Sequence, residues 1–426
     1  MLKFLLKFNR PAAKRLVKTP SLAFDGRGKP LKAAFPAFTV PKKYVPYAQL
    51  AALSLVGYSL WWYYYPHNPF PKSVAKLLRN GLWQERKFQD YETGLRFFID
   101  ALEECKRLEM DPLSDGYTGI EIKIAEMYEK LNLKQRANTV YFDILKRIDT
   151  ALKQNTVESE QKRGELIKRD LSCIVKVFEN QEGCTKEPSS AAPRYLQYHL
   201  DLVQDEIFKK DPQLKELVTN TDNIAKLRTK RDIPDMKRYR HILEPFKEEF
   251  FATRDLHTEL CLKANDIEEA LSSKLVTVGW MVLGNVSPGK ILLSQANLGS
   301  LLYLKSEKME NALYTLKKQG GDPDAILLLQ NNHDNFMSMA TRYYENVIAG
   351  AGRTEKAVIA SRNVEPETLQ AITLSLYGLG VIKLHRGNPM EAKMLLNEAK
   401  TMATEIGFQD LCFEADRELS RIREGV

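Results

Sequence analysis

The chain has 426 residues, which is more than one compact helical domain requires. Of these residues 44% are hydrophobic and 28% are charged, so the chain is apolar enough to bury a core. Its formal net charge of +8 resides in residues 1–43, which hold eleven of the 63 basic residues and only one of the 55 acidic residues. Because the remaining chain is nearly neutral, the charge distribution argues against a nucleic-acid-binding protein.

The N-terminal segment is predicted to be a mitochondrial transit peptide followed by a linker. Residues 1–18 are basic and free of acidic residues, and on a helix their lysines and leucines fall on opposite sides. This composition is typical of a transit peptide, with a basic tail beside a membrane as the alternative. Residues 20–46 contain five prolines, which predicts an extended linker, so that residues 1–46 form the leader region.

Residues 47–65 (YAQLAALSLVGYSLWWYYY) contain no charged residue and predict one transmembrane helix. Nineteen helical residues span about 28 Å, close to the hydrocarbon thickness of about 30 Å. A helix buried in a globular core is the alternative. Basic residues precede the segment and aromatic residues end it, and we predict that five of them anchor it at the membrane interfaces: Lys42, Lys43, Trp61, Trp62 and Tyr65.

The charge asymmetry around this segment predicts its orientation. The basic N-terminal side is expected to stay on the more negative side of the membrane. With a transit peptide that side is the mitochondrial matrix, so the chain from residue 72 onward should lie in the intermembrane space. The expected localisation is therefore the mitochondrial inner membrane, in a single pass.

From residue 72 onward the apolar spacing is helical, and no alternating strand pattern with hairpin turns occurs, which predicts an all-α fold. Segments rich in Gly, Pro and polar residues separate stretches of helix-pair size. We predict two helical-repeat arrays, residues 72–180 and residues 241–424. Between them, residues 181–240 are expected to form a charged connector, of which residues 209–240 are the most charged part.

Several segments follow the 34-residue spacing of tetratricopeptide repeats, in which small residues let two helices approach closely. The clearest copy is Leu376, Leu379, Gly380, Gly387, Ala392, Leu396 and Ala399. A second copy is Ile124, Ala125, Tyr128, Ala137, Tyr141 and Ile144. A looser copy runs from Leu298 and Gly299 to Ala312, and Gly94, Phe98 and Ala101 mark a first pair. Such pairs stack into a solenoid, with an irregular helical bundle as the alternative.

The motifs of enzymes and metal sites are missing from the sequence. It has no phosphate-binding GxxxxGK[ST], no HExxH and no GxSxG, and Gly378–Gly380 is expected to serve helix packing. His241 and His257 are too far apart to share a helical metal site, and the five cysteines are scattered without a CxxC pair. We therefore predict a non-enzymatic protein with no catalytic residues, no cofactor and no metal.

Four segments carry a resemblance to a known family. They are SDGYTGIEIKIAEMYEKLN (114–132), LEPFKEEFFATRDLHTELCL (243–262), VGWMVLGNVSPGKILLSQANLGSLLYL (278–304) and LSLYGLGVIKLHRG (374–387). These segments resemble the tetratricopeptide-containing adaptor subunits of the fungal mitochondrial i-AAA protease supercomplex, or a paralogue of them. The resemblance covers most of residues 72–420 and is weakest in the leader, in 181–240 and in 305–365.

The resemblance implies a function. Such an adaptor would associate with a membrane-anchored i-AAA protease, a second adaptor subunit and lipid of the inner membrane, and it would deliver unfolded proteins for degradation. ATP and zinc would belong to the protease, and neither a nucleic acid nor a small-molecule substrate is expected. The alternative is a scaffold or assembly factor for an inner-membrane complex that binds no clients.

A client would be bound in the concave groove of the solenoid, lined by the first helix of each repeat. The candidate groove residues are Glu126, Glu129, Ser300, Tyr303, Tyr377 and His385. Ordinary solvent exposure or packing between repeats is the alternative role for each of them.

Overall fold

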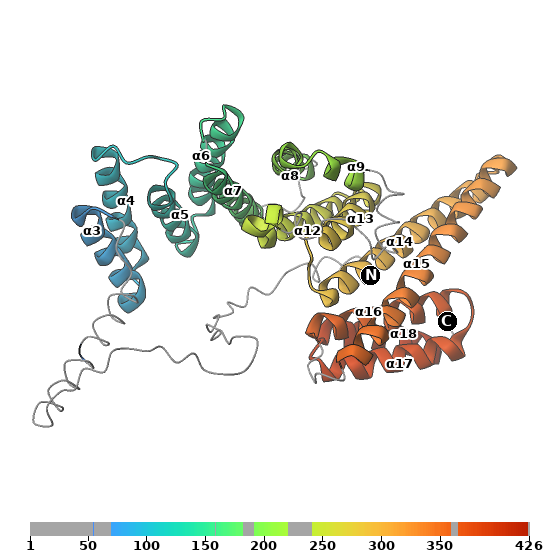
Figure 1. The fold of residues 1–426 in the computed structure, drawn as a ribbon. Coiled ribbons are helices and arrows are strands. Elements are labelled where there is room, and N and C mark those ends of the chain that lie inside the picture. The colour runs from blue at the N-terminus through green and yellow to red at the C-terminus, as the bar shows by residue number, and fades with distance from the viewer. Residues whose placement is uncertain are drawn as a thin grey trace, which may run out of the picture. The chain divides into compact units, whose positions relative to one another are not determined.

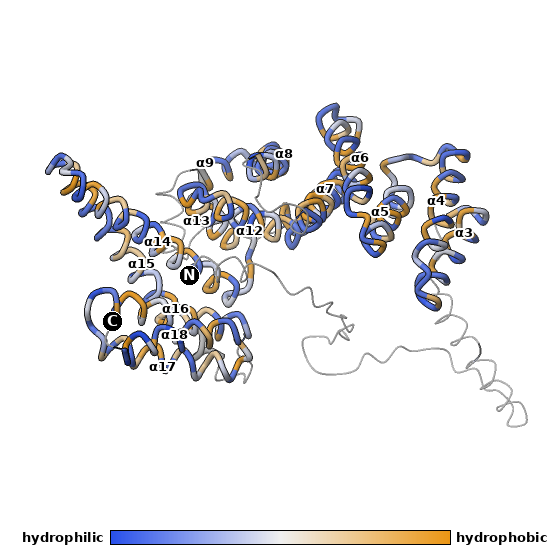
Figure 2. Tube along the Cα trace, turned by 180° about the vertical axis from the view of Figure 1, so that it is seen from behind, coloured by the Kyte–Doolittle hydropathy of each residue, from blue (hydrophilic) through white to orange (hydrophobic). Residues whose placement is uncertain are grey.

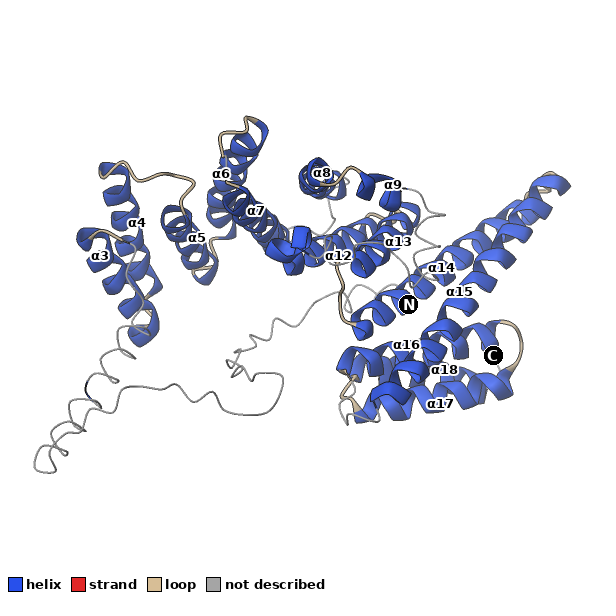
Figure 3. Cartoon of the chain, viewed as in Figure 1, coloured by secondary structure: helices blue, strands red, loops and turns tan. Residues whose placement is uncertain are grey.

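The computed structural model describes Ser54 and residues 70–157, 159–181, 191–219, 241–358 and 365–424. These residues form helices joined by turns, and no strand occurs among them (Figure 3). The prediction of an all-α protein is therefore confirmed. The chain divides into two compact units, with the boundary between Met127 and Tyr128.

The first unit contains α3 (Lys72–Trp83), α4 (Tyr91–Arg107) and most of α5 (Asp115–Lys130). The helices of the second unit follow in chain order (Figure 1): α6 (Lys134–Lys153), α7 (Glu160–Gln181), α8 (Ala192–Lys210), α9 (Gln213–Thr219), α12 (Lys247–Lys263), α13 (Ile267–Leu283), α14 (Pro288–Lys318), α15 (Pro323–Val358), α16 (Pro366–His385), α17 (Pro389–Glu405) and α18 (Gln409–Glu424). Hydrophobic and hydrophilic residues alternate along the helices, as expected for helices that bury one side (Figure 2).

The first helix pair packs closely at a glycine. A Cβ atom added to Gly81 of α3 would lie 2.8 Å from the ring of Phe98 in α4, so a larger residue does not fit there. α4 begins after Asp90, whose carboxylate accepts a hydrogen bond of 3.0 Å from the backbone N–H of Thr93. The predicted contact residues Gly94, Phe98 and Ala101 are all buried.

In the part of the predicted charged connector that the structure describes, residues 191–219 form the helices α8 and α9. α8 buries Leu196, Leu200, Val203 and Ile207 and packs against α7 and α12. These residues recur every third or fourth position, so α8 has an apolar side in spite of the charges around it. Residues 182–190 and 220–240 of the connector lie outside the described residues.

Trp280 of α13 joins three helices of this region. Its side chain is fully buried, and its ring stacks on Phe208 of α8 with 6.0 Å between the ring centroids. Phe250 of α12 meets the same ring edge-on at 5.6 Å. The three rings therefore hold α8 in the core formed with α12 and α13.

A buried polar network lies between α12 and α13. Nε of Arg254 donates a hydrogen bond of 2.9 Å to Oγ1 of Thr277, and Nδ1 of His257 lies 2.9 Å from Oγ of Ser273. All four side chains are buried. Burial lowers the pKa of Arg254 to about 10, and burial together with the charge of Arg254 lowers the pKa of His257 to about 4. His257 is thus held in its neutral form at neutral pH.

The low pKa of His257 predicts a loss of stability in mild acid. The unfolded chain takes up this proton near pH 6.5 but the folded chain only near pH 4, so the free energy of unfolding should fall as the pH decreases through this window. The contribution is at most about 3 kcal/mol. Urea unfolding at pH 7 and pH 4.5 should therefore show a larger pH effect for the wild type than for His257→Gln.

The matched control for this experiment is the exposed His241. His241→Gln should keep the full pH effect of the wild type. An equal pH effect in the wild type and in His257→Gln would show that this histidine is not the group that titrates.

α14 and α15 form a long antiparallel hairpin. α14 ends in a turn where Gly320 adopts a φ of +69°, a conformation that favours glycine. The loose repeat copy predicted from Leu298 and Gly299 to Ala312 does not form a pair of helices, because all three residues lie in α14. Residues 303–318 contain neither glycine nor proline, so nothing in the sequence ends the helix before residue 318.

Tyr344 of α15 lies at the point where α14, α15 and α16 pack together. A Cβ atom added to Gly378 of α16 would lie 2.3 Å from the Tyr344 ring, and one added to Gly299 of α14 would lie 2.9 Å from it. The hydroxyl of this tyrosine lies 2.9 Å from Oγ of Ser300. The two glycines thus make room for one buried aromatic ring, and the predicted packing role of Gly378 is confirmed.

The clearest predicted repeat forms the helix pair α16–α17. A Cβ atom added to Gly380 of α16 would lie 2.8 Å from Leu396 of α17, and Gly387 turns the chain between the two helices with a φ of +73°. Ala392, Leu396 and Ala399 are fully buried. α18 packs against α17 and closes the C-terminal end of the fold.

The predicted leader, linker and transmembrane helix fall outside the described residues, apart from Ser54, and so do the interface residues Lys42, Lys43, Trp61, Trp62 and Tyr65. Among the helices that the structure does describe, none combines the length and the apolar character that a membrane span requires.

Candidate functional site

Three of the residues predicted to line a groove are interior side chains. Ser300 and Tyr303 of α14 and Tyr377 of α16 are 0%, 3% and 2% exposed. Ser300 and Tyr303 are covered by α15: the hydroxyl of Ser300 lies 2.9 Å from that of Tyr344, and Tyr303 packs in one cluster with Met337 and Tyr344. Tyr377 lies in a second cluster, which includes Val347 of α15 and Leu411 and Ala415 of α18. All three side chains therefore belong to the core.

The two predicted groove residues of α5 form local polar contacts. A carboxylate oxygen of Glu126 accepts a hydrogen bond of 2.8 Å from Nζ of Lys123, which also contacts Glu85 at 3.0 Å. A carboxylate oxygen of Glu129 accepts hydrogen bonds from the hydroxyl of Tyr141 at 3.1 Å and from the amide of Asn180 at 2.8 Å. Glu129 therefore ties the end of α5 to α6 and α7.

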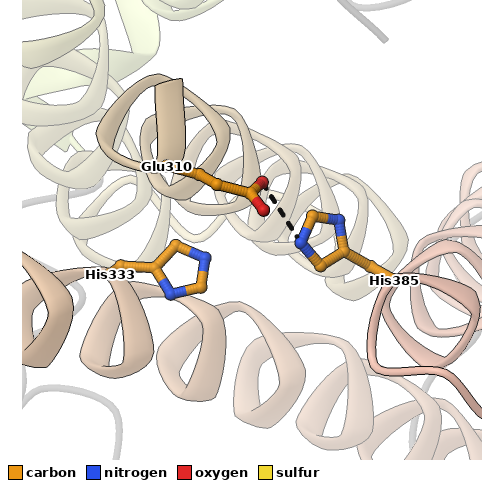
Figure 4. Close-up of side chains that lie close together, drawn as sticks. All are labelled: Glu310, His333 and His385. Atoms are coloured by element: carbon orange, nitrogen blue, oxygen red, sulfur yellow. Dashed lines mark ion pairs between the residues drawn. The ribbon is translucent and has the colours of Figure 1, made fainter. Parts of the chain in front are cut away.

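His385, the last predicted groove residue, lies in a polar cluster at the junction of α14, α15 and α16. Its Nε2 atom lies 3.2 Å from a carboxylate oxygen of Glu310, and its Nδ1 atom lies 3.4 Å from the hydroxyl of Tyr303. The ring of His333 faces the same place from α15 (Figure 4). One ligand atom each of Glu310, His333 and His385 lies within 4.8 Å of the others.

The two nitrogens of His333 have different surroundings. Nδ1 lies 2.9 Å from a carboxylate oxygen of Asp334. Nε2 is shielded from solvent, and within the described residues no hydrogen-bond partner meets it. Since the carboxylate holds a proton on Nδ1, Nε2 carries the free electron pair and is the atom available to a ligand.

Comparison with known proteins shows where this fold belongs. The MGR3 middle domain family matches residues 154–286. The mitochondrial inner membrane i-AAA protease supercomplex subunit MGR3 of Saccharomyces cerevisiae is 37% identical over 411 residues, which cover 87% of this chain and 81% of that protein. The chain belongs to the MGR3 family. Protein MRG3-like of the same organism is 34% identical over 403 residues, covering 87% of this chain and 86% of its own length.

The MGR3 middle domain begins and ends at helix boundaries of this structure. It starts directly after α6 and ends directly before α14, so it contains the Trp280 core and the Arg254 network. It also contains the whole of residues 181–240, the predicted connector. The polar cluster of Glu310, His333 and His385 lies beyond it, in the C-terminal part.

The α14–α15 hairpin of this MGR3-family chain extends beyond its contacts with α16, and its end projects from the α16–α18 helices (Figure 1). From residue 307 to residue 336 no side chain is buried. Three large apolar side chains are nevertheless exposed near its end: Tyr314 at 70%, Leu327 at 59% and Leu328 at 64%. We call these three residues the hairpin tip. Exposed apolar groups gathered on one element are typical of a protein-binding surface.

Sequence reasoning missed Glu310, His333 and the hairpin tip. The three cluster residues lie far apart in the chain and have no motif spacing, so no local signal joins them. The hairpin tip did leave a signal, because LLLQNNHDN at 327–335 places apolar and polar residues in two separate blocks without the spacing of a buried helix.

Proposed function

We propose that this chain is a non-enzymatic adaptor subunit of an i-AAA protease complex in the mitochondrial inner membrane. The observation that carries the proposal is the 37% identity to MGR3, which is named as a subunit of such a supercomplex, over 87% of this chain. An all-helical fold without a catalytic motif supports a role in binding other proteins. The partners would be the protease, a second adaptor subunit and unfolded clients, and no nucleic acid or small-molecule substrate is involved.

The finer architecture is also part of the proposal. We assign residues 1–46 to a transit peptide and linker and residues 47–65 to one transmembrane helix, with the N-terminus in the matrix and the helical body in the intermembrane space. The helix pairs would be of the tetratricopeptide type, in two arrays at 72–180 and 241–424 with residues 181–240 between them. The α16–α17 pair, which packs through Gly380 and Leu396, supports this repeat assignment.

Anchoring to the same membrane as the protease explains how a weak binder would be effective. Tethered binding modules reach effective concentrations of roughly millimolar, so capture of a client beside the protease needs only modest affinity. Weak and tolerant binding suits unfolded proteins, which share exposed apolar side chains but no common folded surface.

We infer that the hairpin tip, and not the buried groove residues, contacts the clients. Its three apolar side chains are exposed near the end of the hairpin. A stable complex of folded proteins buries about 800 Å² on each partner, which is more than three side chains provide. A few exposed apolar side chains can instead contact many different unfolded partners weakly.

The association with the protease is tested by affinity purification of the full chain from detergent-solubilised mitochondria. We expect the i-AAA protease to co-purify in stoichiometric amounts. A purification that yields the chain with other inner-membrane proteins but without the protease would contradict the proposal and favour the scaffold alternative.

Client binding is tested by changing Tyr314, Leu327 and Leu328 together to serine. Because these side chains are exposed, the fold should be unaffected, and crosslinking of the full chain to an unfolded intermembrane-space protein should fall at least threefold while the protease still co-purifies. The control changes the exposed Met390 and Met394 of α17 to serine and should leave crosslinking unchanged. Equal crosslinking to unfolded and folded forms of the same protein would indicate a scaffold that binds no clients.

A further inference from the structure

We propose that Glu310, His333 and His385 bind a Zn²⁺ ion that links α14, α15 and α16. The proposal is independent of the adaptor function. It rests on the donor atoms that the three helices bring together, on the buried and unpartnered Nε2 of His333, and on the groups that hold the two imidazole rings.

The donor set is that of a zinc site. Two neutral imidazoles and one carboxylate are among the common zinc ligands, whereas Ca²⁺ and Mg²⁺ take oxygen ligands almost alone. The ligands come from three different helices and are brought together by the packing around Tyr344, so they approach the same point from different directions (Figure 4).

The distances require only small movements of exposed side chains. Tetrahedral zinc with bonds of about 2.0–2.1 Å places its ligand atoms roughly 3.3 Å apart. Nε2 of His385 and the carboxylate oxygen of Glu310 are already 3.2 Å apart, and all three ligand atoms lie within 4.8 Å of one another. The side chains of Glu310 and His385 are 49% and 28% exposed, which leaves them free to turn toward His333.

The surroundings of the histidines fit a metal ligand better than a core residue. Histidines that bind zinc usually donate their second ring N–H to a carboxylate or another oxygen, which fixes the ring and the tautomer. Here Nδ1 of His333 meets the carboxylate of Asp334 at 2.9 Å, and Nδ1 of His385 meets the hydroxyl of Tyr303 at 3.4 Å. The buried Nε2 of His333, which has no hydrogen-bond partner in the described part of the chain, is then explained as a ligand atom.

The bound ion would hold the base of the hairpin against α16. Bound zinc would join the exposed half of α14 and α15 to the C-terminal end of α16, beyond the buried contacts that end near Ser306. Three protein ligands leave a fourth position, which the exposure of Glu310 and His385 opens to water. The site therefore braces the base of the hairpin and leaves its tip unaffected.

The test is a Zn²⁺ titration of the purified full chain, stripped of metal and followed by competition with a chromogenic chelator. We expect one Zn²⁺ per chain, and Co²⁺ in its place should give the strong visible absorption of tetrahedral coordination. His333→Gln and His385→Gln should each weaken binding at least tenfold. The exposed His241, which lies outside the cluster, provides the matched control, and His241→Gln should bind like the wild type.

Glu310→Gln keeps the test decisive if a histidine variant misfolds, because Glu310 is exposed and its replacement leaves the core intact. It should also weaken Zn²⁺ binding at least tenfold while the circular dichroism spectrum stays that of the wild type. Wild-type chain that takes up clearly less than one Zn²⁺, or Glu310→Gln and His385→Gln that bind with unchanged affinity, would overturn the proposal.

Discussion

Replacing Trp280 with alanine should lower the free energy of unfolding by about 3–5 kcal/mol. The fully buried ring stacks on Phe208 of α8 and meets Phe250 of α12 edge-on, so its removal leaves a cavity where three helices join. α8 should lose the aromatic contact between Phe208 and α13 and become more accessible to proteases. Urea unfolding of the full chain and limited proteolysis measure the two effects.

Two further substitutions serve as controls for this prediction. Trp280→Phe keeps an aromatic ring in the same place and should cost less than the alanine variant. Trp83 of α3 is exposed, and Trp83→Ala should change the stability by no more than about 0.5 kcal/mol. If Trp280→Ala unfolds at the same urea concentration as the wild type, the ring does not hold α8 in the core.

Replacing Gly378 with alanine should destabilise the second unit by about 2 kcal/mol, although alanine is the better helix former. The added Cβ atom would lie 2.3 Å from the ring of Tyr344, which is fully buried and packs so closely on Gly299 that a Cβ atom added there would lie only 2.9 Å from the ring. The overpacking cost therefore exceeds the gain in helix propensity. The midpoint of urea unfolding measures the net effect.

A second substitution, at Tyr344, distinguishes overpacking from other causes of the lost stability. Tyr344→Leu replaces the aromatic ring by a smaller aliphatic side chain, so Gly378→Ala should cost much less in that background than in the wild type. Gly352 of α15 serves as the control, because among the described residues no atom beyond its own stretch of helix lies within 4 Å of an added Cβ there, and Gly352→Ala should stabilise by about 0.5–1 kcal/mol. Equal costs of Gly378→Ala with and without Tyr344→Leu would contradict the steric explanation.

The helices of this protein could be predicted from the sequence because their signals are local. Apolar residues recur at helical spacing, and Gly and Pro mark the ends of the segments. The α16–α17 pair was predictable in detail, since Gly380, Leu396 and Ala399 report a close approach of two neighbouring helices. The segment from Leu298 to Ala312 resembled the repeat spacing by chance, because alanine and leucine are common within any single helix.

The exposure of a helix face could not be predicted, because it depends on elements distant in the sequence. Ser300, Tyr303 and Tyr377 have the spacing of groove residues, and nothing near them in the sequence indicates that α15 covers the first two or that residues of α15 and α18 pack around the third. Residues 181–240 were predicted to be a connector because they are charged. Within this region, however, α8 has an apolar side that packs against α7 and α12.

The cluster of Glu310, His333 and His385 shows the same limit for a binding site. Each residue alone is an ordinary polar residue of a helix surface, and only the packing of α14, α15 and α16 around Tyr344 places their ligand atoms within 4.8 Å. The membership in the MGR3 family, in contrast, was readable from long segments such as residues 278–304, which are far more specific than the repeat spacing.

The central claim is that this chain brings unfolded proteins to the i-AAA protease, and the half-life of such a client tests it most directly. In cells that lack the chain, an unfolded intermembrane-space substrate of the protease should be degraded several times more slowly, at an unchanged amount of protease, and the wild-type chain should restore its degradation. A client half-life that is the same with and without the chain would contradict the account.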